Sequence, residues 1–217
     1  GGQASIDIGR PENESLIKLA ADSGCRFLFV GLESVDTETL AEAGKRVNRP
    51  EEYRKAVKLL HKHGISVLGA FIFGFDHDEA SSFARTVRFA RALELDAAQF
   101  TILTPLPQTQ VMDKLQAEGR IFNCDWANYD FRTCVFAPSR MSAEELAAGC
   151  QWARKQFYSL ASIVDRLPPI TRPSRFVTYL IVNLAYRIFG MKPQHRVSEK
   201  SASEPRAARQ DEATAPI

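Results

Sequence analysis

The run Phe27-Leu-Phe-Val-Gly-Leu is the feature that most restricts the fold of this 217-residue chain. It ends abruptly in a carboxylate and a hydroxyl, Glu33 and Ser34. A short apolar run rich in aromatic and branched residues is typical of a parallel strand that is buried on both faces. Because ligands bind beyond the carboxyl ends of such strands, Glu33 and Ser34 are candidate site residues. The alternative is that Glu33 is a solvated loop residue that caps the next helix.

Strand and helix patterns alternate along the first part of the chain. Further strands are predicted at residues 3–9, 66–75 and 97–104, with helical patterns between them. This alternation predicts an α/β fold with right-handed crossovers. Four strands make only about half of a closed barrel. We therefore expect residues 1–119 to form either an open sheet or half of a barrel whose other strands precede Gly1.

The rest of the chain has a different character. Residues 120–167 are predicted to form a mostly helical extension, and residues 192–217 a disordered tail. Between them, residues 168–191 contain an apolar helix with basic flanks that Asn183 and Arg187 interrupt. Such a helix at 174–191 either lies in the interface of a membrane or covers the open side of the barrel.

Composition and cysteine spacing give no support for a nucleic-acid-binding or metal-binding protein. A formal net charge of +2 gives no argument for a nucleic-acid partner. The four cysteines lack the close spacing of a zinc or iron–sulfur site, and we interpret them as buried free thiols. The run from Asp76 to Glu79 is interpreted as a turn and helix start, so no metal site is predicted. The absence of a signal peptide favours the cytoplasm, with or without membrane association.

Polar side chains gather on one face of two predicted strands. Gln3, Ser5 and Asp7 alternate with apolar residues in the first strand, and Gln99 and Thr101 share a face of the fourth. A purely structural barrel interior would be filled by branched apolar residues. The pattern therefore predicts a polar lumen that binds a small molecule.

The third strand carries a different signal. Gly69 lacks a side chain, so a flat ligand could approach the backbone there. Phe71 and Phe73 alternate with it on the same face and could accept an adenine-like ring. The alternative is ordinary packing between a helix and the strand.

Three segments in this order resemble a known family. They are Gly31-Leu-Glu-Ser34, the stretch 64–75, and Leu103-Thr-Pro-Leu-Pro-Gln-Thr109. Together they are similar to strands four, five and six of the barrel of radical S-adenosylmethionine (SAM) enzymes. The branch with an N-terminal cobalamin-binding domain, which includes the hopanoid C-2 methylase, is the most similar, and the resemblance extends over about residues 2–160.

The resemblance implies a partial (β/α)6 TIM-like barrel, comprising strands three to six, with a mostly helical C-terminal extension. It implies that Glu33 and Ser34 contact the ribose or methionine part of SAM, and that a basic residue stands at Lys45. Other implied positions are cofactor-binding residues on the later strands and substrate-lining residues on the first: Gly69, Phe71, Phe73, Gln99 and Thr101, with Gln3, Ser5 and Asp7. The implied cofactors are SAM and, in a complete parent, a [4Fe–4S] cluster and cobalamin.

Two departures from the family pattern limit these expectations. The chain has neither the Cys-x-x-x-Cys-x-x-Cys loop that holds the cluster nor the Gly-Gly-Glu segment that binds the amino group of SAM. Gln108 stands where the family usually has a glycine, which predicts backbone strain in that turn.

Two functions follow as hypotheses. In the first, the chain is the C-terminal part of a cobalamin-dependent, methyltransferase-like radical SAM enzyme that acts on an unactivated carbon of a lipid-like or other small molecule. It would be inactive alone, and a partner chain or a preceding segment would supply the missing half-barrel. In the second, it is a non-catalytic, truncated barrel that acts as an interaction or membrane-peripheral module.

Overall fold

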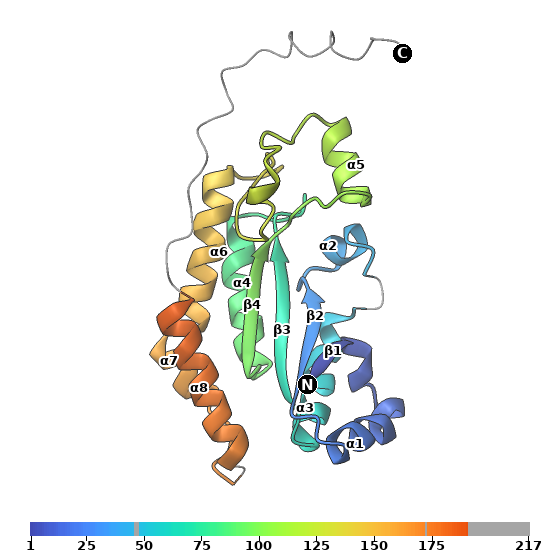
Figure 1. Ribbon diagram of the computed structural model, residues 1–217, viewed down its shortest axis with the longest axis vertical. Helices are drawn as coiled ribbons and strands as arrows, with labels where there is room; N and C mark the ends of the chain where they lie inside the picture. Colours follow the sequence, from blue (N-terminus) through green and yellow to red (C-terminus); the bar gives the residue numbers. More distant parts are fainter. Residues whose placement is uncertain (46–47, 172, 191–217) are drawn as a thin grey trace, which may run out of the picture.

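A four-stranded parallel sheet forms the centre of the protein (Figure 1). The computed structural model describes residues 1–45, 48–171 and 173–190. The strands are adjacent in chain order: β1 (Gly2–Ser5), β2 (Phe27–Glu33), β3 (Ser66–Phe73) and β4 (Ala97–Ile102). This sheet and the helices between its strands confirm the predicted α/β architecture.

Helices connect the strands and continue after β4. The connecting elements are η1 (Ile6–Gly9), η2 (Pro11–Asn13), α1 (Glu14–Asp22), α2 (Thr37–Glu42), α3 (Pro50–Lys62) and α4 (Ala80–Ala92). After β4 follow α5 (Gln110–Ala117), η3 (Trp126–Asn128), α6 (Ala143–Phe157), α7 (Leu160–Asp165) and α8 (Pro173–Phe189). The predicted disordered tail, 192–217, lies outside the described residues.

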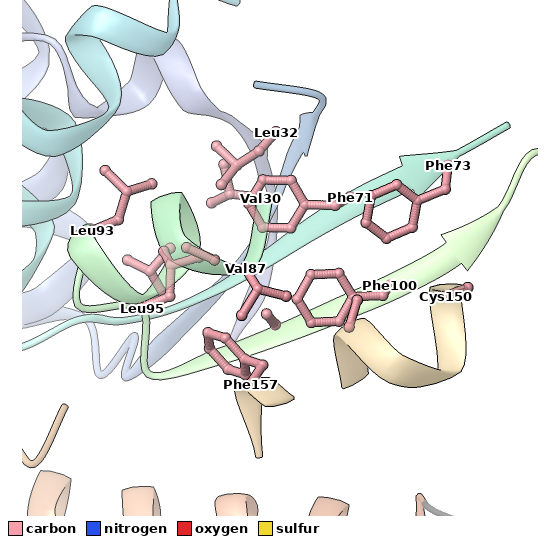
Figure 2. Packing of buried hydrophobic residues seen from close by; sticks show 14 of the residues in the cluster. Val30, Leu32, Phe71, Phe73, Val87, Leu93, Leu95, Phe100, Cys150 and Phe157 are labelled. Carbon is pink, nitrogen blue, oxygen red and sulfur yellow. The ribbon is translucent and has the colours of Figure 1, made fainter. Parts of the chain in front are cut away.

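One face of the sheet is packed against helices. Phe71 of β3 and Phe100 of β4 stack with ring centroids 5.7 Å apart, and Phe157 of α6 meets Phe100 edge-on at 5.7 Å. Phe73 meets Phe83 of α4 at 4.8 Å. Figure 2 shows the rings of Phe71, Phe73, Phe100 and Phe157 in this cluster. We call this side the covered face; its packing joins the strand–helix unit and the helical extension in one hydrophobic core.

The first strand is shorter than predicted. It ends at Ser5, and residues Ile6–Gly9 form a 3-10 helix. Ile6 is buried, and a Cβ atom on Gly9 would lie 2.4 Å from the Cβ atom of Ala56. Close packing on α3 therefore turns the chain away from the strand direction. Asp7 does not continue the strand face of Gln3 and Ser5, which corrects its predicted place in the lumen.

The two edges of the sheet differ. At β4, the Tyr158 hydroxyl accepts from the Ala98 amide (3.0 Å) and donates to the Ala98 carbonyl (2.8 Å). Arg154 donates to the Phe100 carbonyl at 3.0 Å, and the Ile102 amide donates to the Phe131 carbonyl at 2.9 Å. The outer edge of β1 pairs with no other strand among the described residues. The outer backbone groups of β4 named here therefore already have hydrogen-bond partners, while the outer edge of β1 can pair with a further strand.

Candidate functional site

The strand register places two polar and two small residues in one row across the sheet. Ser5 pairs with Gly31, Gly31 with Ala70, and Ala70 with Gln99. Residues that pair directly point to the same face of a sheet. We call these four residues the central row and their side of the sheet the open face. Its two middle positions, Gly31 and Ala70, hold small residues and lie between two hydrogen-bonding side chains.

Gly69, Phe71 and Phe73 lie on the covered face instead. Phe71 is 0% exposed and Phe73 is 2% exposed. A Cβ atom on Gly69 would lie 2.7 Å from a Leu95 methyl carbon and 2.9 Å from a Leu32 methyl carbon. The prediction that Gly69, Phe71 and Phe73 contact a ligand is therefore corrected. These residues pack in the core between the strands and the helices, as the alternative interpretation had it. The glycine that serves the open face is Gly31, which the sequence analysis did not single out for this role.

Glu33 carries its carboxylate over the central row. The register shifts between Gly31 and Glu33, and the backbone of Glu33 has a φ of 62°. Such a bulge re-aims the side chain. A Cβ atom on Gly31 would lie 2.6 Å from Glu33 Oε1, and Lys45 Nζ lies 3.5 Å from the same oxygen. The Glu33 carboxylate thus lies at the carboxyl end of β2, partly buried and close to the positive charge of Lys45.

Two residues of the following segment hold this bulge. Asn48 is buried, and its Nδ2 donates to the carbonyl oxygens of Gly31 (3.1 Å) and Leu32 (3.2 Å). The Tyr53 hydroxyl donates to the Leu32 carbonyl at 3.0 Å, and burial raises the pKa of Tyr53, so it keeps its proton. Sequence patterns marked Tyr53 only as a core residue and did not mark Asn48, because the contact depends on where α3 meets β2.

Ser34 shapes the turn after β2. It is buried, its amide donates to the Leu32 carbonyl at 2.8 Å, and its hydroxyl accepts from the Asp36 amide at 3.1 Å. Asp36 is the residue that caps α2, so the alternative of Glu33 as a helix cap is wrong. The contact of Ser34 with a cofactor stays a prediction.

The second polar residue of β4, Thr101, extends the open face toward the carboxyl end. Thr101 pairs with Ile72, and its hydroxyl donates to the Phe71 carbonyl at 3.2 Å. Gln99 and Thr101 line a cavity of about 380 Å³ together with Asp130 and Arg154. On the amino-terminal side, Gln3 lies in the row that continues through Phe29, Leu68 and Ala97.

Comparison with known proteins identifies the strand–helix unit. Residues 5–90 match the model of the Radical SAM superfamily. This part of the chain belongs to the radical SAM superfamily. The family predicted from the order of the motifs is thereby confirmed, and radical SAM proteins use SAM together with a [4Fe–4S] cluster.

Individual relatives of this radical SAM chain are methyltransferases. Bacteriochlorophyllide d C-12(1)-methyltransferase of Chlorobaculum tepidum is 32% identical over 164 residues, which cover 76% of this chain and 36% of that protein. The hopanoid C-2 methylase of Rhodopseudomonas palustris is 28% identical over 132 residues, which cover 59% of this chain and 24% of that protein. The chain therefore spans about a third or less of the length of these two relatives.

One solved structure is also similar. It is the radical SAM methyltransferase TsrM from Kitasatospora setae with cobalamin and a [4Fe–4S] cluster bound. The TM-score is 0.49 with 18% sequence identity, and the match covers 76% of this chain and 34% of that one.

The four cysteines do not gather into a [4Fe–4S] site. Cys25 is partly buried and Cys124 is exposed, so the interpretation of all four as buried thiols is wrong for these two. Cys134 and Cys150 are buried in the hydrophobic core, and burial raises the pKa of each thiol to about 11. A cluster ligand must be a thiolate, which this environment disfavours. Among the described residues, no group of three or more His, Cys, Asp or Glu side chains is placed to hold a metal ion.

The acidic run after β3 has a structural role. Asp76 accepts from Arg120 Nη1 (2.8 Å), Lys114 Nζ (2.5 Å) and Ser139 Oγ (2.6 Å). Burial alone would raise the pKa of Asp76, but the hydrogen bonds from these three donors, two of them charged, outweigh it and hold the pKa well below its usual range. Asp78 accepts from the backbone amides of Gly74 and Phe75. The run ties the end of β3 to α5 and the extension.

The turn after β4 shows the strain that its sequence predicts. Gln108 has a φ of 64°, in the left-handed region that glycine adopts without penalty. The radical SAM chain therefore keeps the glycine-type conformation here despite the side chain.

Proposed function

We propose that this chain forms the SAM-binding, C-terminal half of the barrel in a cobalamin-dependent radical SAM methyltransferase. The observation that carries the proposal is the Glu33 carboxylate above Gly31, at the carboxyl end of β2, within the segment that matches the superfamily. Parallel α/β barrels bind their ligands at this end.

The open face suits a ligand with one flat part and several hydrogen-bonding groups. Gly31 and Ala70 present little beyond backbone, so an adenine ring could lie against them. The Glu33 carboxylate can accept hydrogen bonds from ribose hydroxyls or from an ammonium group. Ser5 and Gln99, about three strand spacings apart, supply polar groups at the two ends of the row.

The chain's own residues bind and orient in this proposal. A reduced cluster, when bound in the complete protein, would supply the electron that cleaves the sulfonium of SAM. Since the cysteines here do not fit that cluster, its ligands would come from residues beyond this sequence. The unpaired outer edge of β1 supports the proposal that further barrel strands, from the same polypeptide or a partner chain, add there.

The substrate is proposed to be a large, mainly apolar molecule. The names of two relatives give bacteriochlorophyllide d and a hopanoid as the methylated compounds. Both are ring systems, and the first is not a hopanoid-type lipid. Within the predicted class of lipid-like or other small molecules, we therefore propose a bulky apolar ring compound with an unactivated carbon.

A non-catalytic module is the second candidate. The specific observation in its favour is that none of the four cysteines in these 217 residues forms the cluster motif. Anaerobic reconstitution of the chain followed by iron and sulfide assays tests this point. A stoichiometric [4Fe–4S] cluster on this chain would contradict both our assignment of the cysteines and the module hypothesis.

Equilibrium binding of SAM to wild type and to Glu33→Gln tests the proposed function. The substitution keeps the shape of the side chain but removes its charge, so we expect affinity to fall by about tenfold. Glu38→Gln is the matched control, because the Glu38 side chain is 75% exposed on α2 and its contact with His77, at 3.4 Å, lies at the surface. No binding of SAM at millimolar concentration, or equal affinity of Glu33→Gln and wild type, would contradict the proposal.

A further inference from the structure

Helix α8 carries an aliphatic stripe on its outer side. Val177, Ile181, Leu184 and Ile188 follow one another at intervals of four, three and four residues, which places them on one face of the helix. All four are exposed, with Ile181 63% and Ile188 64% accessible. We call these four residues the α8 stripe.

The polar residues of α8 point the other way. Asn183 is 0% exposed and donates to the Asp96 carbonyl at 2.8 Å. Arg187 donates to the Tyr158 carbonyl at 3.1 Å, and Arg175 lies 2.9 Å from the Asp96 carboxylate. The residues that interrupt the apolar pattern in the sequence therefore anchor the inner side. α8 packs against the protein with that inner side, and its outer side carries the aliphatic side chains of the stripe, with exposed Thr178 beside them.

This rotation of α8 is fixed by buried contacts. Arg166, itself buried, donates to the Asn183 side-chain oxygen at 3.1 Å and to the Leu95 carbonyl at 2.7 Å. The Tyr179 hydroxyl donates to the Ile163 carbonyl at 2.8 Å. Turning the stripe inward would leave several buried polar groups without partners, at a cost of about 1–3 kcal/mol each. The stripe thus remains available to a partner.

The sequence around the stripe has one sign of charge. Between Asp165 and Glu199 the sequence contains six Lys and Arg and no Asp or Glu. Arg166, Arg175 and Arg187 make the inward contacts described above. The other three, Arg172, Lys192 and Arg196, flank α8 in the sequence. Anionic lipid headgroups attract such a segment, whereas a second copy carrying the same positive segment would be repelled. None of the helices in the described residues is long and apolar enough to cross a membrane. An amphipathic helix of this kind lies along the interface instead.

We propose that the α8 stripe docks the protein on a bilayer that contains anionic lipids, with α8 parallel to the membrane surface. Exposed Leu160 and Val164 of the neighbouring α7 enlarge the apolar surface of this helical region. The inference is independent of the proposed function, because it rests on α8 and on charge rather than on the open face. It assigns the membrane, rather than a protein, as the partner of this surface.

Vesicle co-sedimentation of the full chain tests the proposal. Wild type is compared on phosphatidylcholine vesicles and on vesicles with about one third phosphatidylglycerol, and we expect clear binding to the anionic vesicles that weakens with salt. Ile181→Glu/Ile188→Glu should lower the partition coefficient by at least about tenfold. The matched control is Leu16→Glu/Leu19→Glu on α1, whose side chains are 50% and 62% exposed and which should bind as wild type.

Two results would overturn the membrane assignment. One is equal partitioning of wild type and the α8 double variant, or no binding of either. The other is a dimer in sedimentation velocity that the α8 double variant abolishes while wild type ignores vesicles, which would show that a second copy occupies the stripe.

A second variant keeps the test decisive if the glutamates prevent folding. Ile181→Trp adds an emitter in the stripe, and its fluorescence should shift to shorter wavelength and be quenched by brominated lipid in anionic vesicles. Leu19→Trp is the control and should show neither change. Unchanged emission of the Ile181→Trp protein would contradict the proposal.

Discussion

The two faces of the sheet are built from the same four strands but differ in their side chains. One face is packed with aromatic rings, and the other carries small and polar residues. The covered face stacks Phe71, Phe100 and Phe157 under the helices. The open face has Gly31 and Ala70 at the same depth along the strands, with a carboxylate above them. Core residues and residues of the proposed binding surface alternate along each strand, because neighbouring side chains point to opposite faces.

The largest expected contrast lies between two neighbours on β4. Phe100→Ala removes a fully buried ring from the covered face and should lower the free energy of unfolding by about 3–5 kcal/mol. Gln99→Ala, one residue away on the open face, should change it by less than about 0.5 kcal/mol. Urea denaturation of both variants measures the contrast, and similar losses for the two would break it.

Gly69 of β3 and Gly31 of β2 provide a medium-sized contrast, because they lie on opposite faces of the sheet. Gly69→Ala crowds the methyl groups of Leu95 and Leu32 and should cost about 1–3 kcal/mol of stability. Gly31→Ala meets the movable end of the Glu33 side chain instead, so it should cost less stability while weakening SAM binding. Thermal unfolding and ligand titration of both variants check this pair. A stability loss at Gly31 equal to that at Gly69 would contradict the assignment of faces.

The smallest expected effect is at the turn beyond β4. Gln108→Gly relieves a left-handed backbone conformation at an exposed residue. Because glycine also loses more chain entropy on folding, the net gain should be no more than about 1 kcal/mol. Gln110→Gly, in the first turn of α5, is the control and should destabilise. A loss of stability in Gln108→Gly would show that the side chain contributes more than its strain costs.

The strands and their order could be predicted from the sequence, but the assignment of faces could not. Apolar runs and turn residues located β2, β3 and β4 to within a few residues. Gly69 and Gly31 are both strand glycines, and only the register shows that Gly31 shares a face with Ala70 and Gln99 while Gly69 shares one with Ala98. Since one residue of shift exchanges the faces, a pattern read without register assigned Phe71 and Phe73 to the wrong side.

Other features depended on contacts between distant segments. The order of the motifs predicted the family, and Glu33 and Lys45 do lie together, with Nζ and Oε1 3.5 Å apart. Asn48 escaped notice because an asparagine before a helix has many local roles. The inner and outer sides of α8 were likewise hidden, since the contact of Asn183 with the Asp96 carbonyl spans 87 residues.

The most direct test of the open face is a methyl NMR titration of the full chain with SAM. Ala70 lies in the central row, and Ala98, which pairs with Gly69, lies on the covered face of the adjacent strand. With alanine methyl groups labelled, we expect the Ala70 signal to move with increasing SAM, even at an affinity of only about 1 mM, while the Ala98 signal stays in place. An unmoved Ala70 signal, or a shift at Ala98 alone, would contradict the claim that the open face binds the cofactor.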